Sequence, residues 1–153
     1  RRHLFFTAMG GYDTHASQRG ELWSRYDELG PALAAFQRAL DALGVAAEVT
    51  TFTLSDFNRT FRVNANAGTD HAWGSHQIVM GGAVKGGTFY GTFPTLAIGG
   101  PDDAGDEGQW IPTTALDQVG ATLARWFGVP PADLPQVFPN LGAFATPDLG
   151  FLT

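Results

Sequence analysis

Apolar residues spaced by three and four positions run through the first third of the chain and constrain its fold most. They predict one amphipathic helix over residues 21–43, because this spacing places the apolar side chains on a single stripe. Gly44 follows as a suitable C-cap. Pro31 lacks an amide donor and is expected to kink or split the helix. The stripe consists of Leu22, Tyr26, Leu29, Leu33, Phe36, Leu40 and Leu43.

Strand-like segments lie on both sides of this helix. Residues 3–9 are apolar and aromatic and end at a Gly-Gly pair, and residues 48–54 are β-branched and aromatic. Both patterns are typical of buried strands. A strand, a helix and a second strand over about fifty residues form a crossover whose two strands are parallel neighbours. The sequence therefore predicts an α/β fold, a mostly parallel sheet flanked by helices.

The last third of the chain predicts a second helix and an irregular tail. Leu116, Val119 and Leu123 give the helix an apolar face, and Gly128 ends it. The acidic stretch 99–108 lacks the spacing of a calcium loop and is expected to be a solvated turn. With 153 residues and no internal repeat, the chain is expected to form a single domain.

Composition excludes several classes of function. A net charge of −6 with no long basic run argues against nucleic acid or an anionic membrane as the main partner. The absence of cysteine excludes disulfides, zinc–thiolate sites and thiol nucleophiles. No apolar run approaches the roughly 18 residues of a membrane-spanning helix, so no membrane span is expected.

Histidines and aspartates gather in three loops that follow the predicted strands. Asp13 and His15 come after the first strand, Asp56 comes after the second, and His71 and His76 lie in a later glycine-bracketed loop. Ligands of open α/β sheets sit beyond the carboxyl ends of the strands, so the first two loops are expected to meet. These five residues are the candidate metal ligands.

Imidazole and carboxylate groups together suit a divalent metal, with zinc as the first expectation and manganese, iron, magnesium or calcium as alternatives. Each residue also has a simpler interpretation. His76 alone is as well explained by a structural hydrogen bond as by metal binding. Asp70 either forms a turn or orients His71 as an outer carboxylate. No catalytic nucleophile is identified.

Several blocks of the sequence resemble the DUF1501 proteins. They are residues 11–15 (Gly-Tyr-Asp-Thr-His), 52–60 (Phe-Thr-Leu-Ser-Asp-Phe-Asn-Arg-Thr), 68–76 (Gly-Thr-Asp-His-Ala-Trp-Gly-Ser-His), 81–87, and 126–128 with 137–141. The resemblance implies that residues 1–153 are the C-terminal part of a longer domain. DUF1501 proteins commonly carry an export signal, so a periplasmic or secreted location is implied.

The DUF1501 family is similar in turn to the alkaline phosphatase and sulfatase superfamily. This implies an α/β/α sandwich with a two-metal centre. Asp13 and His15 match the first Asp/His pair of that centre, with a narrower spacing, and His71 matches its late histidine. Asp56 matches the aspartate of a second Asp-His pair, but Phe57 stands where histidine is expected.

The resemblance implies a metal-dependent hydrolase of phosphate or sulfate esters. The partner would then be a small-molecule ester substrate. Alternatively, a partner chain could supply the N-terminal part that members of the family have and that residues 1–153 do not match. Two alternatives remain open. One is a non-catalytic exported module that binds metal or a surface, and the other is a structural subunit of a larger assembly.

Overall fold

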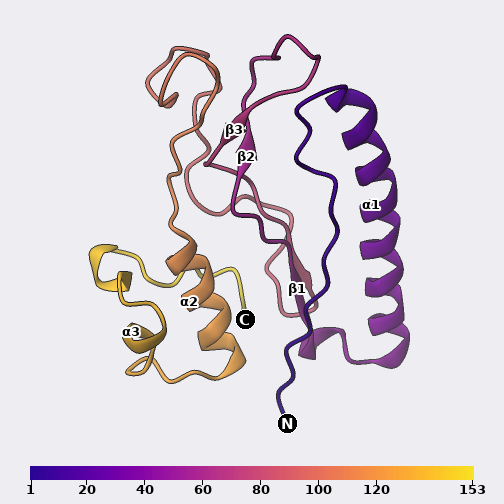
Figure 1. Cartoon of the computed structure of the whole chain (residues 1–153). Coiled ribbons are helices and arrows are strands. Elements are labelled where there is room, and N and C mark those ends of the chain that lie inside the picture. Colours follow the sequence, from indigo (N-terminus) through magenta and orange to yellow (C-terminus); the bar gives the residue numbers. More distant parts are fainter.

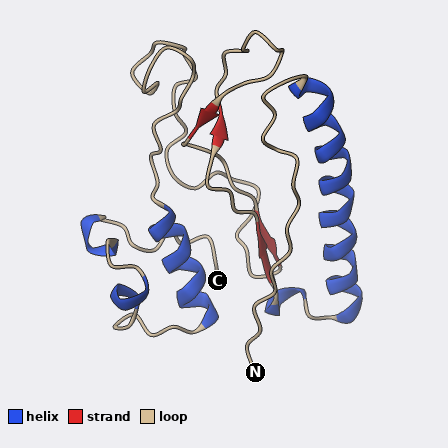
Figure 2. Ribbon diagram, viewed as in Figure 1, coloured by secondary structure: helices blue, strands red, loops and turns tan.

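The computed structural model describes all residues, Arg1–Thr153. Figure 1 shows one long helix on one side, short strands in the middle and a small helical unit on the other side. The helices are α1 (Gln18–Leu43), α2 (Leu116–Phe127) and α3 (Leu134–Val137), with 3₁₀ turns η1 (Ala46–Glu48) and η2 (Leu141–Ala143). The strands are β1 (Thr50–Phe52), β2 (Asn58–Arg59), β3 (His71–Ala72) and β4 (Val79–Gly81). Loops make up most of the remainder, as Figure 2 shows.

The long helix predicted from the apolar stripe is confirmed as α1. Gly44 caps it with φ 71°, a left-handed conformation that glycine adopts without strain. Pro31 neither splits nor ends the helix. Only one stripe residue, Leu40, is fully buried, and Tyr26, Phe36 and Leu43 are exposed. The stripe therefore covers less of the molecule than its length suggests.

The predicted parallel sheet is wrong. The structure contains two separate two-stranded sheets, and both pairs are antiparallel. β1 lies within the predicted second strand, but it pairs with β4, with Thr51 opposite Met80. β2 pairs with β3 and places Arg59 opposite His71. An α/β/α sandwich is not formed, because no strand runs parallel to β1.

Residues 3–9 form no strand, which also corrects the sequence prediction. No residue before Tyr12 takes part in a backbone–backbone hydrogen bond. A strand needs a hydrogen-bonded neighbour, and the only strand paired with β1, the expected neighbour, is β4. The crossover predicted from local pattern therefore does not form.

The second helix is confirmed as α2, which ends at Gly128. The Gln118 side chain accepts a hydrogen bond from the Ala115 amide at 2.9 Å and donates one to the Thr146 carbonyl at 2.6 Å. These bonds fix the start of α2 and tie the C-terminal tail to it. A small apolar cluster of Ala121, Leu134 and Leu141 joins α2, α3 and η2.

The acidic stretch 99–108 forms the expected surface turns, which fold around one carboxylate. Asp103 is buried and accepts hydrogen bonds from four backbone amides, those of Gly99, Gly105, Gly108 and Gln109, at 2.8–3.2 Å. Burial raises the pKa of Asp103, but the four hydrogen bonds outweigh it and lower the pKa to about 2. The ionised Asp103 carboxylate therefore holds this loop together through its hydrogen bonds.

Candidate metal centre

Asp13, His15 and His71 meet in one cluster, and their candidate ligand atoms lie within 4.8 Å of one another. Asp13 Oδ1 lies 2.8 Å from His71 Nε2 and 3.1 Å from His15 Nδ1. The two imidazole rings have centroids 5.0 Å apart. Asp13 and His15 lie in the loop before α1, and His71 is the first residue of β3, more than fifty positions further along the sequence.

The cluster offers ligand types that a divalent metal ion can use. Two imidazole nitrogens and one carboxylate oxygen are three protein ligands, and a tetrahedral zinc ion with bonds near 2.0–2.1 Å needs ligand atoms about 3.3 Å apart. The distances of 2.8 and 3.1 Å are close to this value. All three residues are exposed, so a fourth position would face solvent.

Hydrogen bonds at the start of α1 join the loop of Asp13 and His15 to the loop that leads into β3. The Gln18 side-chain oxygen accepts hydrogen bonds from Thr14 Oγ1, at 2.8 Å, and from Thr69 Oγ1. The Thr69 amide donates to the Thr14 carbonyl at 3.1 Å. Both threonines are buried. Because Thr14 and Thr69 adjoin the candidate ligands, this network fixes the separation between Asp13 and His71.

Gly68 is required where the loops cross. A Cβ added there would lie within 2.4 Å of backbone atoms of His15 and Ala16. No real Cβ makes such contacts, so any other residue would force the two loops apart. The loop that carries His71 therefore passes directly over the loop that carries His15.

Arg59 is a buried residue that donates a hydrogen bond to Asp13. Its side chain is only 10% exposed, and its Nη1 atom donates to Asp13 Oδ1 at 2.7 Å. Its Nε atom donates to Thr69 Oγ1 at 3.0 Å, and its Nη2 atom donates to the Thr69 carbonyl. The antiparallel pair β2–β3 brings Arg59 here by placing it opposite His71.

These contacts keep Asp13 ionised. The hydrogen bond from His71 is the largest cause of a lowered pKa for Asp13, and the charges of His15, His71 and Arg59 add to it against the opposing effect of desolvation. An ionised carboxylate is the form that binds a metal ion. Phe57 stacks on the His71 ring, with centroids 5.0 Å apart and an angle of 14° between the planes, and so restricts its orientation.

The other residues proposed from the sequence do not join the cluster. Asp56 lies in an exposed bend before β2. His76 packs against Phe93, with ring centroids 4.9 Å apart. Asp70 accepts a hydrogen bond from the Asn64 side chain at 3.3 Å, and its backbone carbonyl accepts one from the Thr60 amide. Metal binding by Asp56 and His76 stays a prediction.

Arg59 is the functional residue that sequence reasoning missed. It lies three positions after Asp56, at the end of a polar stretch, and its partner Asp13 is 46 residues away. The only signal in the sequence was the position of this arginine just after the loop of Asp56, a candidate metal ligand. Only the pairing of β2 with β3 shows where the guanidinium points.

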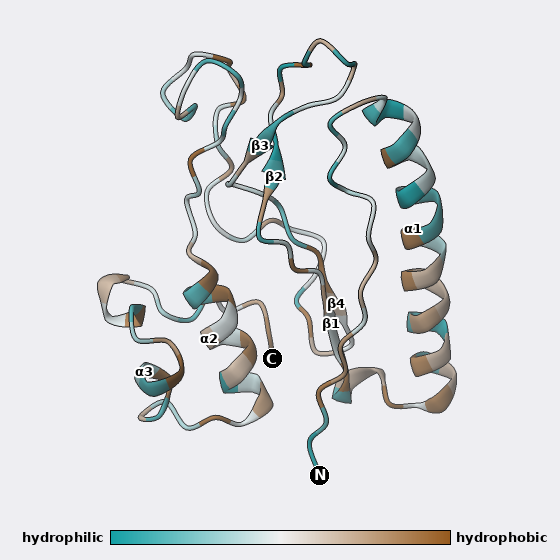
Figure 3. Ribbon diagram, in the orientation of Figure 1, coloured by the Kyte–Doolittle hydropathy of each residue, from teal (hydrophilic) through white to brown (hydrophobic).

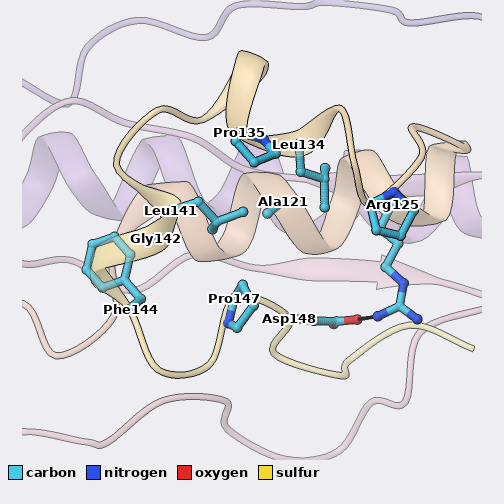
Figure 4. Close-up of a pocket in the computed structure, with 10 residues that line it drawn as sticks. Ala121, Arg125, Leu134, Pro135, Leu141, Gly142, Phe144, Pro147 and Asp148 are labelled. Atoms are coloured by element: carbon cyan, nitrogen blue, oxygen red, sulfur yellow. Dashed lines mark hydrogen bonds and ion pairs between the residues drawn. The ribbon is translucent and has the colours of Figure 1, made fainter.

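A hollow lies between α2, α3 and the tail (Figure 4). It has a volume of about 330 Å³ and a mainly apolar lining that includes Leu134, Leu141 and Phe144. Its charged groups, Arg125 and Asp148, are paired with each other. It therefore offers no free charge or ligand set comparable to the Asp13 cluster.

Comparison with known protein families places most of the chain in one of them. A family model described as "Protein of unknown function (DUF1501)" matches residues 2–120, which include all the candidate ligands. No curated protein and no solved structure matches the chain. In addition, none of the helices combines the length and the apolar character that crossing a membrane requires.

Proposed function

Because the chain belongs to the DUF1501 family, we propose that it carries the divalent-metal centre of a hydrolase for phosphate or sulfate esters. The observation that carries this proposal is the convergence of Asp13, His15 and His71 on one point. The choice of ester rests on the resemblance to alkaline phosphatases and sulfatases. A periplasmic or secreted location is proposed on the same basis.

The residues of the cluster have separate roles in this proposal. Asp13, His15 and His71 hold the ion, and zinc fits their two nitrogens and one oxygen best. A bound ion of this kind supplies a Lewis acid that polarises an ester oxygen and stabilises developing negative charge. Arg59 holds the Asp13 carboxylate in place, and Phe57 restricts the His71 ring.

The charge of the loaded site suits an anionic ester. A divalent cation and the Arg59 guanidinium together exceed the single charge of Asp13, so the centre would attract phosphate or sulfate oxygens. The cluster is exposed, which leaves room for a substrate. No nucleophile is assigned within this chain.

A non-catalytic metal-binding module is the second candidate. The observation that favours it is the position of Asp56, which lies apart from the cluster and is followed by Phe57 rather than histidine. A two-metal centre would need further ligands near His71, where Phe57 is stacked instead. One bound ion without turnover would support this candidate.

Metal content and turnover test the proposal together. The dialysed chain should retain close to one equivalent of zinc, manganese or iron by inductively coupled plasma mass spectrometry. The Asp13→Asn/His71→Gln double variant should lose that metal while keeping its circular dichroism spectrum. Asp27→Asn, which changes an exposed aspartate of α1 that is not a candidate ligand, is the matched control and should retain it.

The metal-loaded chain is then assayed with p-nitrophenyl phosphate and p-nitrophenyl sulfate. Turnover that disappears in the double variant would support a hydrolase. Metal without turnover would favour the binding module. Retention of metal by the double variant would refute the ligand assignment.

A further inference from the structure

Asn64 donates hydrogen bonds to both segments that carry the candidate metal ligands. It lies in the loop between β2 and β3 and is half-buried. Its Nδ2 atom donates to the His15 carbonyl at 3.1 Å and to Asp70 Oδ1 at 3.3 Å. His15 is itself a candidate ligand, and Asp70 directly precedes His71. One side-chain amide therefore joins the two sides of the cluster.

The oxygen of the Asn64 amide shapes the turn formed by residues 64–68. This Oδ1 atom accepts hydrogen bonds from the backbone amides of Asn66 and Gly68, both at 3.0 Å. Because an amide oxygen accepts and an NH₂ group donates, these two bonds determine which end of the side chain faces the His15 carbonyl. The turn and the contact with His15 thus depend on the same side chain.

The turn meets the start of α1 at two residues with a left-handed backbone. Ala67 has φ 55° and Ser17 has φ 48°, and no other non-glycine residue of the chain has a positive φ. The Ser17 amide donates to the Asn66 carbonyl at 3.1 Å, and the Gln18 amide donates to the Ala67 carbonyl at 3.0 Å. Left-handed conformations are unfavourable for alanine and serine and persist where surrounding contacts impose them. The junction is therefore held in one defined geometry.

Polar contacts, rather than packing, determine where the His15 ring lies. Figure 3 shows the first turn of α1, which follows His15 closely, in mainly hydrophilic colours. The His15 side chain is 50% exposed, so packing alone does not fix it. Asn64 is the residue whose side chain hydrogen-bonds to the His15 backbone. The position of His15 therefore depends on Asn64.

We propose that Asn64 is a positioning residue of the metal centre, which holds His15 at the distance from His71 that a shared ion requires. Arg59 holds the Asp13 carboxylate, and Asn64 has the corresponding role for His15. The effect on metal binding rests on the proposed function, but the positioning of the two histidines exists without an ion. It can therefore be measured separately.

Asn64→Asp separates the two roles of the side chain. It keeps an oxygen that accepts from the amides of Asn66 and Gly68, so the turn is retained. It replaces the NH₂ group by a second oxygen, which cannot donate to the His15 carbonyl and repels the Asp70 carboxylate. We expect the loop of His15 to move away from the loop that leads into β3.

Two measurements follow this movement. The ring centroids of His15 and His71 lie 5.0 Å apart, so the metal-free wild type should show a nuclear Overhauser effect between their carbon-bound ring protons. Asn64→Asp should lose it. Zinc affinity should fall about 10-fold, as is typical when an outer contact of a metal ligand is removed. The added carboxylate by itself would favour a cation, so weaker binding would come from the displaced histidine.

Asn140→Asp is the matched control, because it adds the same charge at an exposed asparagine far along the chain. It should keep both the nuclear Overhauser effect and the zinc affinity. Asn64→Ser is shorter and uncharged and should show both losses, with an unchanged circular dichroism spectrum in each variant.

An Overhauser effect that is absent in the wild type or persists in Asn64→Asp would overturn the proposal, as would equal zinc affinity in these two chains. A wild type that shows the effect but binds no zinc would refute the proposed function. Loss of the effect in Asn64→Asp would then still support the positioning of His15 by Asn64.

Discussion

Arg59 is a buried cation whose main partner is a candidate metal ligand. Its guanidinium donates to Asp13 and to two oxygen atoms of Thr69, so it joins both loops of the cluster. Arg59→Met would remove these donors and leave Asp13 free to rotate. Loss of a group that hydrogen-bonds to a metal ligand typically lowers metal affinity by about 10- to 100-fold. We expect Arg59→Met to bind zinc more weakly by a factor in this range, as measured by titration calorimetry.

The control for this prediction is Arg38→Met, which removes an exposed arginine of α1. Its zinc affinity should equal that of the wild type. Arg59→Lys should give an intermediate affinity, because lysine restores the charge but not the planar set of donors. Equal affinity in the wild type and Arg59→Met would show that Asp13 needs no support from Arg59.

The sequence identifies the three candidate ligands but does not identify Arg59. Asp13, His15 and His71 are recognisable from residue type and loop context alone. Their meeting could not be derived, because the predicted route through a parallel sheet is wrong. The loops meet through Gln18 and the threonines instead, and these side-chain contacts leave no periodic pattern in a sequence.

At the scale of elements, the loop around Asp103 is a unit with its own pH dependence. The folded pKa of about 2 lies below the ordinary value of 3.8. A depressed pKa contributes stability that is present above pH 4 and is lost as the pH falls toward 2. Asp103→Asn replaces one acceptor oxygen by an NH₂ donor, so two of the four backbone amides lose their partner.

We therefore expect Asp103→Asn to melt several degrees below the wild type at pH 7, with a difference that shrinks below pH 4. Thermal unfolding followed by circular dichroism at a series of pH values measures this. Asp106→Asn, which changes an exposed aspartate of the same loop, should behave like the wild type. A difference between Asp103→Asn and the wild type that stays constant down to pH 2 would contradict the assigned pKa.

Helices and strands of this chain were not equally predictable. α1 and α2 follow from apolar spacing and a terminal glycine, which are local signals. β1 was located, but its partner β4 lies about thirty residues further along, and the choice of partner depends on non-local packing. Residues 3–9 have the composition of a buried strand but form none, because composition does not indicate which strand would be the neighbour.

The whole molecule has little core to hold its parts together. Of 153 residues, 17 are buried, and the largest buried apolar cluster contains three of them. That cluster belongs to the α2–α3 unit, away from the metal centre. The link between the N-terminal part of α1 and the β2–β3 pair rests on polar contacts among Thr14, Gln18, Arg59 and Thr69.

A metal ion bound by Asp13, His15 and His71 would add a cross-link at this weakly packed junction. An ion at 100 times its dissociation constant stabilises the folded state by about 2.7 kcal/mol. For a chain of this size that corresponds to a rise of roughly 5–10 °C in Tm. We expect this rise on adding zinc and its reversal by a chelator, as measured by scanning calorimetry. His71→Gln should abolish the shift, because it removes one of three ligands without touching the core. The same shift in His71→Gln would mean that zinc stabilises the chain from another site, and the junction would then depend on its hydrogen bonds alone.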